Sequence, residues 1–83
     1  MGCVKIKYSV DDLRQKRPEE LDSSLYARHL HGDDLAVYRK LVMKAKQAAN
    51  GGLIPDGVTH VEICRSGVYS VTGRRNEAPI KII

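Results

Sequence analysis

The chain lacks residues and segments on which several classes of protein depend. Its 83 residues include no Trp, no Phe and only two cysteines, and no apolar run approaches the roughly 20 residues of a membrane-spanning helix. Two cysteines do not make a disulfide framework, and we expect Cys3 and Cys64 to be free thiols. They also stand too far apart in the sequence to form a closely spaced pair of zinc ligands. We therefore expect one small domain over residues 1–83, in the reducing cytoplasm, without membrane contact, metal or cofactor.

Catalytic motifs are also missing. The sequence has no nucleophile elbow, no phosphate-binding glycine loop and no motif of paired carboxylates. His60 and Cys64 would share a strand face, but four residues along a strand separate them by roughly 13 Å, too far for a nucleophile–base pair. His29 and His31 stand two apart on an expected helix and so point in different directions. We expect that the chain is not an enzyme.

Alternating apolar and polar residues predict strands at both ends of the chain. Residues 4–10 alternate cleanly, which is typical of a half-buried strand. Asp11 and Asp12 end this strand, and the polar residues 11–17 read as a connection. Pro79 precedes a short closing strand over residues 80–83 and suits an edge position, because proline cannot donate to a neighbouring strand.

A first helix is expected to begin at Pro18, whose missing N–H costs nothing in a first turn. Leu21, Leu25 and Leu30 give it a narrow apolar stripe, and Gly32 ends it.

A second, stronger helix follows, with Asp33 as its N-cap. Its apolar residues fall within a sector of about 140° at the helical repeat. Gly51 or Gly52 supplies the left-handed residue that ends it. The remaining arc carries four basic residues: Arg39, Lys40, Lys44 and Lys46.

Residues 59–72 predict one β-hairpin, because two alternating runs flank a break that contains Gly67. A loop of only Ser66 and Gly67 would mix apolar with polar residues on each face. A three-residue loop that also includes Arg65 pairs Cys64 with Val68 and gives Gly67 a left-handed position. It gathers four residues on the buried face: Val61, Ile63, Tyr69 and Val71. It leaves six on the other face: His60, Glu62, Cys64, Val68, Ser70 and Thr72.

The predicted order is therefore β-α-α-β-β-β. Each strand has one apolar face, which indicates a sheet covered on one side only. We expect an α+β two-layer sandwich, with a mostly antiparallel sheet of three to four strands and two helices on one face. Those helices should cover the apolar side chains of the closing strand, Ile80 and Ile82, as well as the apolar faces of the other strands.

The net charge of +4 leaves two interpretations of the basic residues. In the first interpretation, acidic residues at the start of the second helix and basic residues after them complement the helix dipole, and no ligand is needed. The alternative is contact with phosphates. Ten residues are candidates for a binding surface: Lys5, Lys7, Arg39, Lys40, Lys44, Lys46, Arg65, Arg74, Arg75 and Lys81.

We expect a small binding or regulatory module that acts through a protein partner, a profile typical of phage or bacterial accessory proteins. The expected register turns Tyr8 and Tyr69 inward, which disfavours a platform for stacking single-stranded bases. Nucleic-acid binding through the basic helix face and the Arg74–Arg75 loop is the alternative function. A homodimer through a sheet edge or the open sheet face also stays open.

Overall fold

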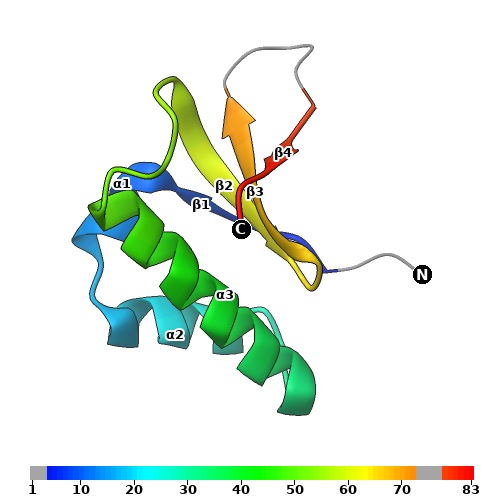
Figure 1. The fold of residues 1–83 in the computed structure, drawn as a ribbon. Helices are drawn as coiled ribbons and strands as arrows, with labels where there is room; N and C mark the ends of the chain where they lie inside the picture. The colour runs from blue at the N-terminus through cyan, green and yellow to red at the C-terminus, as the bar shows by residue number, and fades with distance from the viewer. Residues whose placement is uncertain (1–3, 73–77) are drawn as a thin grey trace.

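The computed structural model describes residues 4–72 and 78–83 (Figure 1). Cys3, Arg74 and Arg75 lie outside the described residues. Seven elements follow one another along the chain: β1 (Ile6–Ser9), α1 (Val10–Gln15), α2 (Pro18–Tyr26), α3 (Gly32–Asn50), β2 (Val58–Cys64), β3 (Gly67–Thr72) and β4 (Ile80–Lys81).

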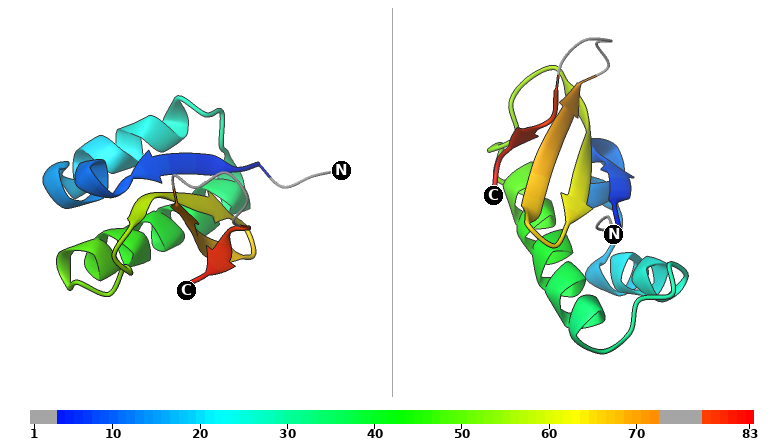
Figure 2. Two further views of the ribbon diagram at one scale, coloured as in Figure 1. Left: turned by 90° about the horizontal axis from the view of Figure 1, so that it is seen from above. Right: turned by 90° about the vertical axis from the view of Figure 1, so that its right-hand side faces the viewer.

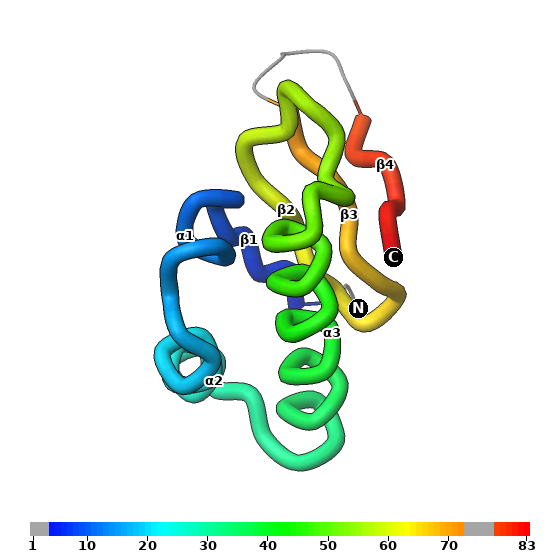
Figure 3. The backbone as a smooth tube through the Cα atoms, turned by 60° about the vertical axis from the view of Figure 1, so that its left-hand side comes forward, coloured from blue at the N-terminus to red at the C-terminus, as the bar shows by residue number. Residues whose placement is uncertain are grey.

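The four strands form one antiparallel sheet in the order β1-β2-β3-β4. The helices lie on one side of it: α3 crosses the sheet in Figure 3, and the other face is turned to the viewer at the right of Figure 2. This arrangement confirms the predicted α+β two-layer class and the edge position of β4. The main helix–sheet contacts run from α1 to β1 and β2 and from α3 to β2 and β3.

The helical layer contains a third helix, α1, where the sequence predicted a connection. Ser9 ends β1 and caps α1, because its Oγ accepts the Asp12 N–H at 3.0 Å. Only Val10 and Leu13 of this short helix are buried. Its mostly polar sequence therefore gives no apolar pattern that would predict a helix. β1 is correspondingly shorter than predicted, and the side chain of Val4 lies outside the strand, 50% exposed.

The connection between α2 and α3 also differs from the prediction. Leu30 is buried, yet it belongs to this connection and not to a helix. His29 has a φ of +59° and Gly32 a φ of +57°, and these two left-handed residues redirect the chain on either side of Leu30. Gly32 therefore begins α3 and does not end α2, and His31 takes the N-cap position expected of Asp33.

The end of α3 agrees with the sequence. Gly52 is left-handed, with a φ of +70°. The Leu53 N–H donates to the Ala48 carbonyl at 2.9 Å, and the Gly52 N–H donates to the Ala49 carbonyl at 3.5 Å. These two bonds make a Schellman motif, which satisfies carbonyls at the helix end. The motif leaves the Leu53 side chain 76% exposed beside the last turns of α3.

The hairpin register differs by one residue from the predicted one. Cys64 pairs with Gly67, Ile63 with Val68 and Glu62 with Tyr69, so only Arg65 and Ser66 connect the strands. A shift of one residue exchanges the faces of the second strand. The predicted inward Tyr69 and outward Val68 are therefore both wrong.

The observed register places Val68 and Ser70 on the face of the sheet that the helices cover. Val68 is fully buried, and Ser70 beside it is also buried. The Ser70 Oγ donates to the Ile80 carbonyl of β4 at 3.3 Å, so a polar side chain is tolerated on the covered face. Tyr69 lies on the open face, with its hydroxyl 2.8 Å from the Ser66 Oγ. The predicted register assumed that Ser70 had to face solvent.

Candidate functional site

Among the residues that it describes, the structure does not gather the predicted basic side chains into one surface. Lys7 and Lys81 lie on the open sheet face, opposite the helices. The four basic residues of α3 divide into two pairs. Arg39 and Lys46 lie on the flank toward α1 and α2, whereas Lys44 lines a hollow with Ile82 and Ile83, and Lys40 lies one turn earlier on α3.

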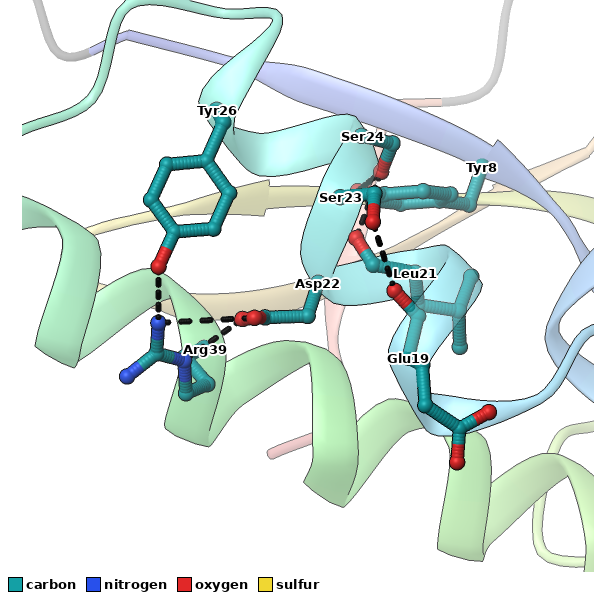
Figure 4. A network of polar contacts seen from close by, with 8 residues as sticks. All are labelled: Tyr8, Glu19, Leu21, Asp22, Ser23, Ser24, Tyr26 and Arg39. Atoms are coloured by element: carbon teal, nitrogen blue, oxygen red, sulfur yellow. Dashed lines mark hydrogen bonds and ion pairs between the residues drawn. The ribbon is translucent and has the colours of Figure 1, made fainter.

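Arg39 belongs to the contact between α2 and α3. Its Nε lies 2.5 Å from the Asp22 Oδ1, and its Nη2 donates to the Tyr26 hydroxyl at 3.0 Å (Figure 4). The hydrogen bond to the Asp22 carboxylate raises the pKa of the Arg39 guanidinium above its ordinary value. This guanidinium is therefore already directed at an anion within the chain.

Lys46 completes the C-terminal end of α1. Its Nζ donates to the carbonyls of Lys16 at 2.7 Å, Leu13 at 2.8 Å and Arg14 at 3.4 Å. These carbonyls have no partner within so short a helix and mark the negative end of its dipole. Lys46 thus stabilises the fold, and the basic arc of α3 is partly structural.

Replacing Lys46 with methionine, which keeps much of the apolar stem, should lower the free energy of unfolding by about 1–2 kcal/mol. The reason is that a charged donor to several carbonyls is lost. The matched control is Lys44→Met, which should stay within about 0.5 kcal/mol of wild type because Lys44 is exposed. Urea unfolding measures both. Equal effects of the two substitutions would contradict the structural role of Lys46.

Arg65 is likewise engaged. It forms an ion pair with Asp34 in the first turn of α3, and so ties the hairpin loop to the beginning of that helix. Both side chains are about half exposed, so the pair contributes little to stability. The Arg65 guanidinium nevertheless has a carboxylate partner, Asp34, within the chain.

The open sheet face carries mixed charge. Lys7, Glu62, Tyr69 and Lys81 form one row across the four strands, and the Lys5 Nζ lies 3.5 Å from the Glu62 Oε1. Tyr69 is an aromatic residue on this face, contrary to the prediction, but a carboxylate is its cross-strand neighbour. A single half-buried ring beside a carboxylate is poorly suited to stacking bases and holding phosphates.

The other tyrosine of the sheet stays inside, as predicted. The Tyr8 hydroxyl lies 2.7 Å from the Ser24 Oγ of α2. Burial raises the pKa of the Tyr8 phenol. Tyr8 therefore links β1 to α2 and is not available on the open face.

Reactive side chains of the hairpin do not converge. The Cys64 Sγ lies 3.0 Å from the Ser66 Oγ, and the His60 Nδ1 lies 3.0 Å from the Thr59 Oγ1. Within residues 4–72 and 78–83, no three His, Cys, Asp or Glu side chains gather as metal ligands would. No helix in the same residues is long and apolar enough to cross a membrane.

The most distinctive surface is an apolar groove between α3 and the C-terminal segment, here called the α3–β4 groove. It is a hollow of about 360 Å³ lined by Lys44, Gln47, Ala48, Leu53, Ile82 and Ile83. Leu53 in this lining is 76% exposed, and Ile80 of β4, which is not part of the lining, is 68% exposed. The prediction that the helices would cover Ile80 is wrong, because α3 lies over β2 and β3.

The apolar surface continues along the same flank of α3. Val37 and Leu41 are half-buried there and lie beside Lys40 and Ala36. Lys40 and Lys44 are exposed, and neither forms a hydrogen bond or ion pair with any residue that the structure describes. The flank thus combines uncovered apolar side chains with two cations that lack an anion from the described chain.

Lys40 and Lys44 were predicted from the sequence as binding residues, but the groove itself was not. The signal available in the sequence was Leu53, an apolar residue directly after the glycines that end α3. No protein-family model, curated protein or solved structure matches this chain.

Proposed function

We propose that the chain is a non-catalytic binding module that acts through a protein partner held in the α3–β4 groove. The observation that carries this proposal is the groove, where Leu53 remains largely exposed and Ile82 is half-buried. Contiguous exposed apolar surface of this kind is typical of interaction sites. The proposed compartment is the cytoplasm, on the strength of the low cysteine content.

The energetics favour a partner at this place. Fully covering a leucine or isoleucine side chain contributes about 1.5–3 kcal/mol. Leu53, with half-buried Ile82 in the same hollow, would therefore supply apolar anchors for such an interface. Because the helices of the chain leave β4 uncovered, these anchors are accessible without any change of fold.

Nucleic-acid binding is less well supported. Lys5, Arg39, Lys46 and Arg65 are directed at anions or carbonyls within the chain. The remaining Lys40 and Lys44 lie on the helical side, whereas Lys7 and Lys81 lie on the opposite sheet face. A duplex or single strand would meet only two of these four at once, and Arg74 and Arg75 lie outside the described residues.

Leu53→Asp tests the proposal. Immobilised wild-type protein should retain a stoichiometric partner from its source cells, and Leu53→Asp should retain at least about tenfold less, because a charge cannot enter an apolar contact. The matched control is Val4→Asp, since Val4 is also an exposed apolar residue but lies beside β1, at the other edge of the sheet. Thermal unfolding confirms that both variants fold.

Equal retention by wild type and Leu53→Asp would contradict the groove as the binding site. Nuclease treatment and low-salt gel shifts with duplex DNA, single-stranded DNA and RNA test the alternative. An affinity whose logarithm falls steeply and linearly with the logarithm of salt concentration would instead support nucleic-acid binding.

A further inference from the structure

We propose that the occupant of the α3–β4 groove is an amphipathic α-helix of the protein partner, with acidic residues flanking its apolar stripe. This inference rests on the proposed function and specifies the chemistry of the partner. The bound helix would pack beside α3, over β4, and extend the helical layer by one member.

The spacing of the layers supports a helix in this position. Neighbouring strands lie about 4.8 Å apart and packed helices about 8–10 Å apart, so each helix covers roughly two strands. In this chain α1 packs on β1 and β2, and α3 packs on β2 and β3. The next place in the layer lies over β4, beside the exposed flank of α3 (Figure 3).

The groove, together with the flank of α3 that leads to it, has the pattern that a helix recognises. Val37, Leu41 and Ala48 run along one flank of α3 at helical spacing. Leu53 beside the last turns of α3 and Ile82 of the C-terminal segment also line the hollow. An apolar stripe at i, i+3, i+4 and i+7 on the incoming helix would pack against these residues.

The two lysines on this flank of α3 indicate which residues should flank the apolar stripe of the partner helix. Lys40 and Lys44 stand four residues apart, one turn along α3, and both are exposed. Among residues 4–72 and 78–83, no acidic residue lines this flank or the hollow beside it. Two acidic side chains one turn apart on a partner helix would face both lysines, and their field would also favour encounter.

The chain already contains the same arrangement on the opposite flank of α3. There α2 packs against α3, with Leu21 and Leu25 buried and Asp22 bonded to Arg39 (Figure 4). An apolar stripe with an adjacent acid thus pairs with a basic residue of α3. The proposed partner helix repeats this contact with Lys40 and Lys44 on the other flank.

A second copy of the chain fits the site less well. A twofold contact through this flank would bring Lys40 and Lys44 toward the same lysines of the other copy, and like charges oppose it. Pairing through the β4 edge would use a strand of only two residues, preceded by Pro79, which has no N–H to donate. Charge and edge length therefore favour a different, acidic partner.

Synthetic peptides test this inference directly. The probes are helical peptides of about 18 residues, five turns, with a leucine stripe flanked by glutamate, the same peptide with lysine for glutamate, and a scrambled glutamate peptide. We expect wild type to bind the glutamate peptide about three- to tenfold more tightly than the lysine peptide. The double variant Lys40→Glu with Lys44→Glu should reverse that preference. Leu53→Asp should bind neither, and 1 M salt should remove the preference.

Fluorescence anisotropy measures the affinities, and circular dichroism checks that each variant and peptide is folded. No binding of any peptide, equal binding of the glutamate and lysine peptides, or a preference that the double variant does not reverse would overturn the inference. A dimer that forms through this flank would also overturn it. Leu53-dependent capture of a cellular partner is measured in a separate experiment. The proposed function can therefore be supported even if the inference of an acidic helix is wrong.

Discussion

Replacing Leu13 with alanine lowers the free energy of unfolding by about 2–5 kcal/mol, the range for truncating a fully buried leucine. Leu13 has no exposed surface, and its helix α1 packs against both β2 and α3. The cavity would open where the sheet and the helical layer meet. Urea unfolding measures the loss.

The matched control is Leu53→Ala, which removes the same atoms from an exposed position and should change stability by about 0.5 kcal/mol or less. A loss at Leu13 no larger than the loss at Leu53 would mean that α1 does not pack as described. The comparison therefore tests the element that the sequence analysis missed.

Replacing Gly67 with alanine should cost about 2–3 kcal/mol, because two separate penalties add. Gly67 has a φ of +148°, where a side chain is strained. An added Cβ would lie 2.5 Å from the Ile83 carbonyl oxygen and 2.8 Å from the Lys81 Cε. The C-terminal segment would have to move.

Amide hydrogen exchange gives this prediction a second readout. The Ile82 N–H donates to the Val68 carbonyl at 2.8 Å, and its protection should fall in Gly67→Ala. The control is Gly52→Ala, where φ is +70° and a Cβ would meet no atom within 4 Å, so only about 1 kcal/mol is expected. Equal costs at the two glycines would contradict the close approach of β4 to the hairpin.

The sequence could predict elements whose signals are local and repeated. Pro18 marks the start of α2, and Gly52 marks the end of α3. Helix α1 escaped because a helix of six residues with two buried side chains has no readable period. The hairpin register escaped because the partner of Ser70 is a carbonyl of β4, ten residues further along the chain.

The candidate site was predictable only as a set of charged residues. Whether a cation meets a ligand or its own chain depends on tertiary neighbours, as Lys46 shows by bonding to the end of a helix that was not predicted. Arg39 depends in the same way on Asp22 of α2. The groove depends on the lateral position of α3 over the sheet, which hydrophobic periodicity does not determine.

Amide hydrogen exchange of the chain with and without its captured partner is the most direct test of the central claim, that a protein binds in the α3–β4 groove. We predict added protection at Leu53, at Ile82 and along the Val37–Ala48 stretch of α3, with little change at Lys7 and Tyr69 on the open sheet face. Protection confined to the open face, with Leu53 and Ile82 unchanged, would contradict the claim.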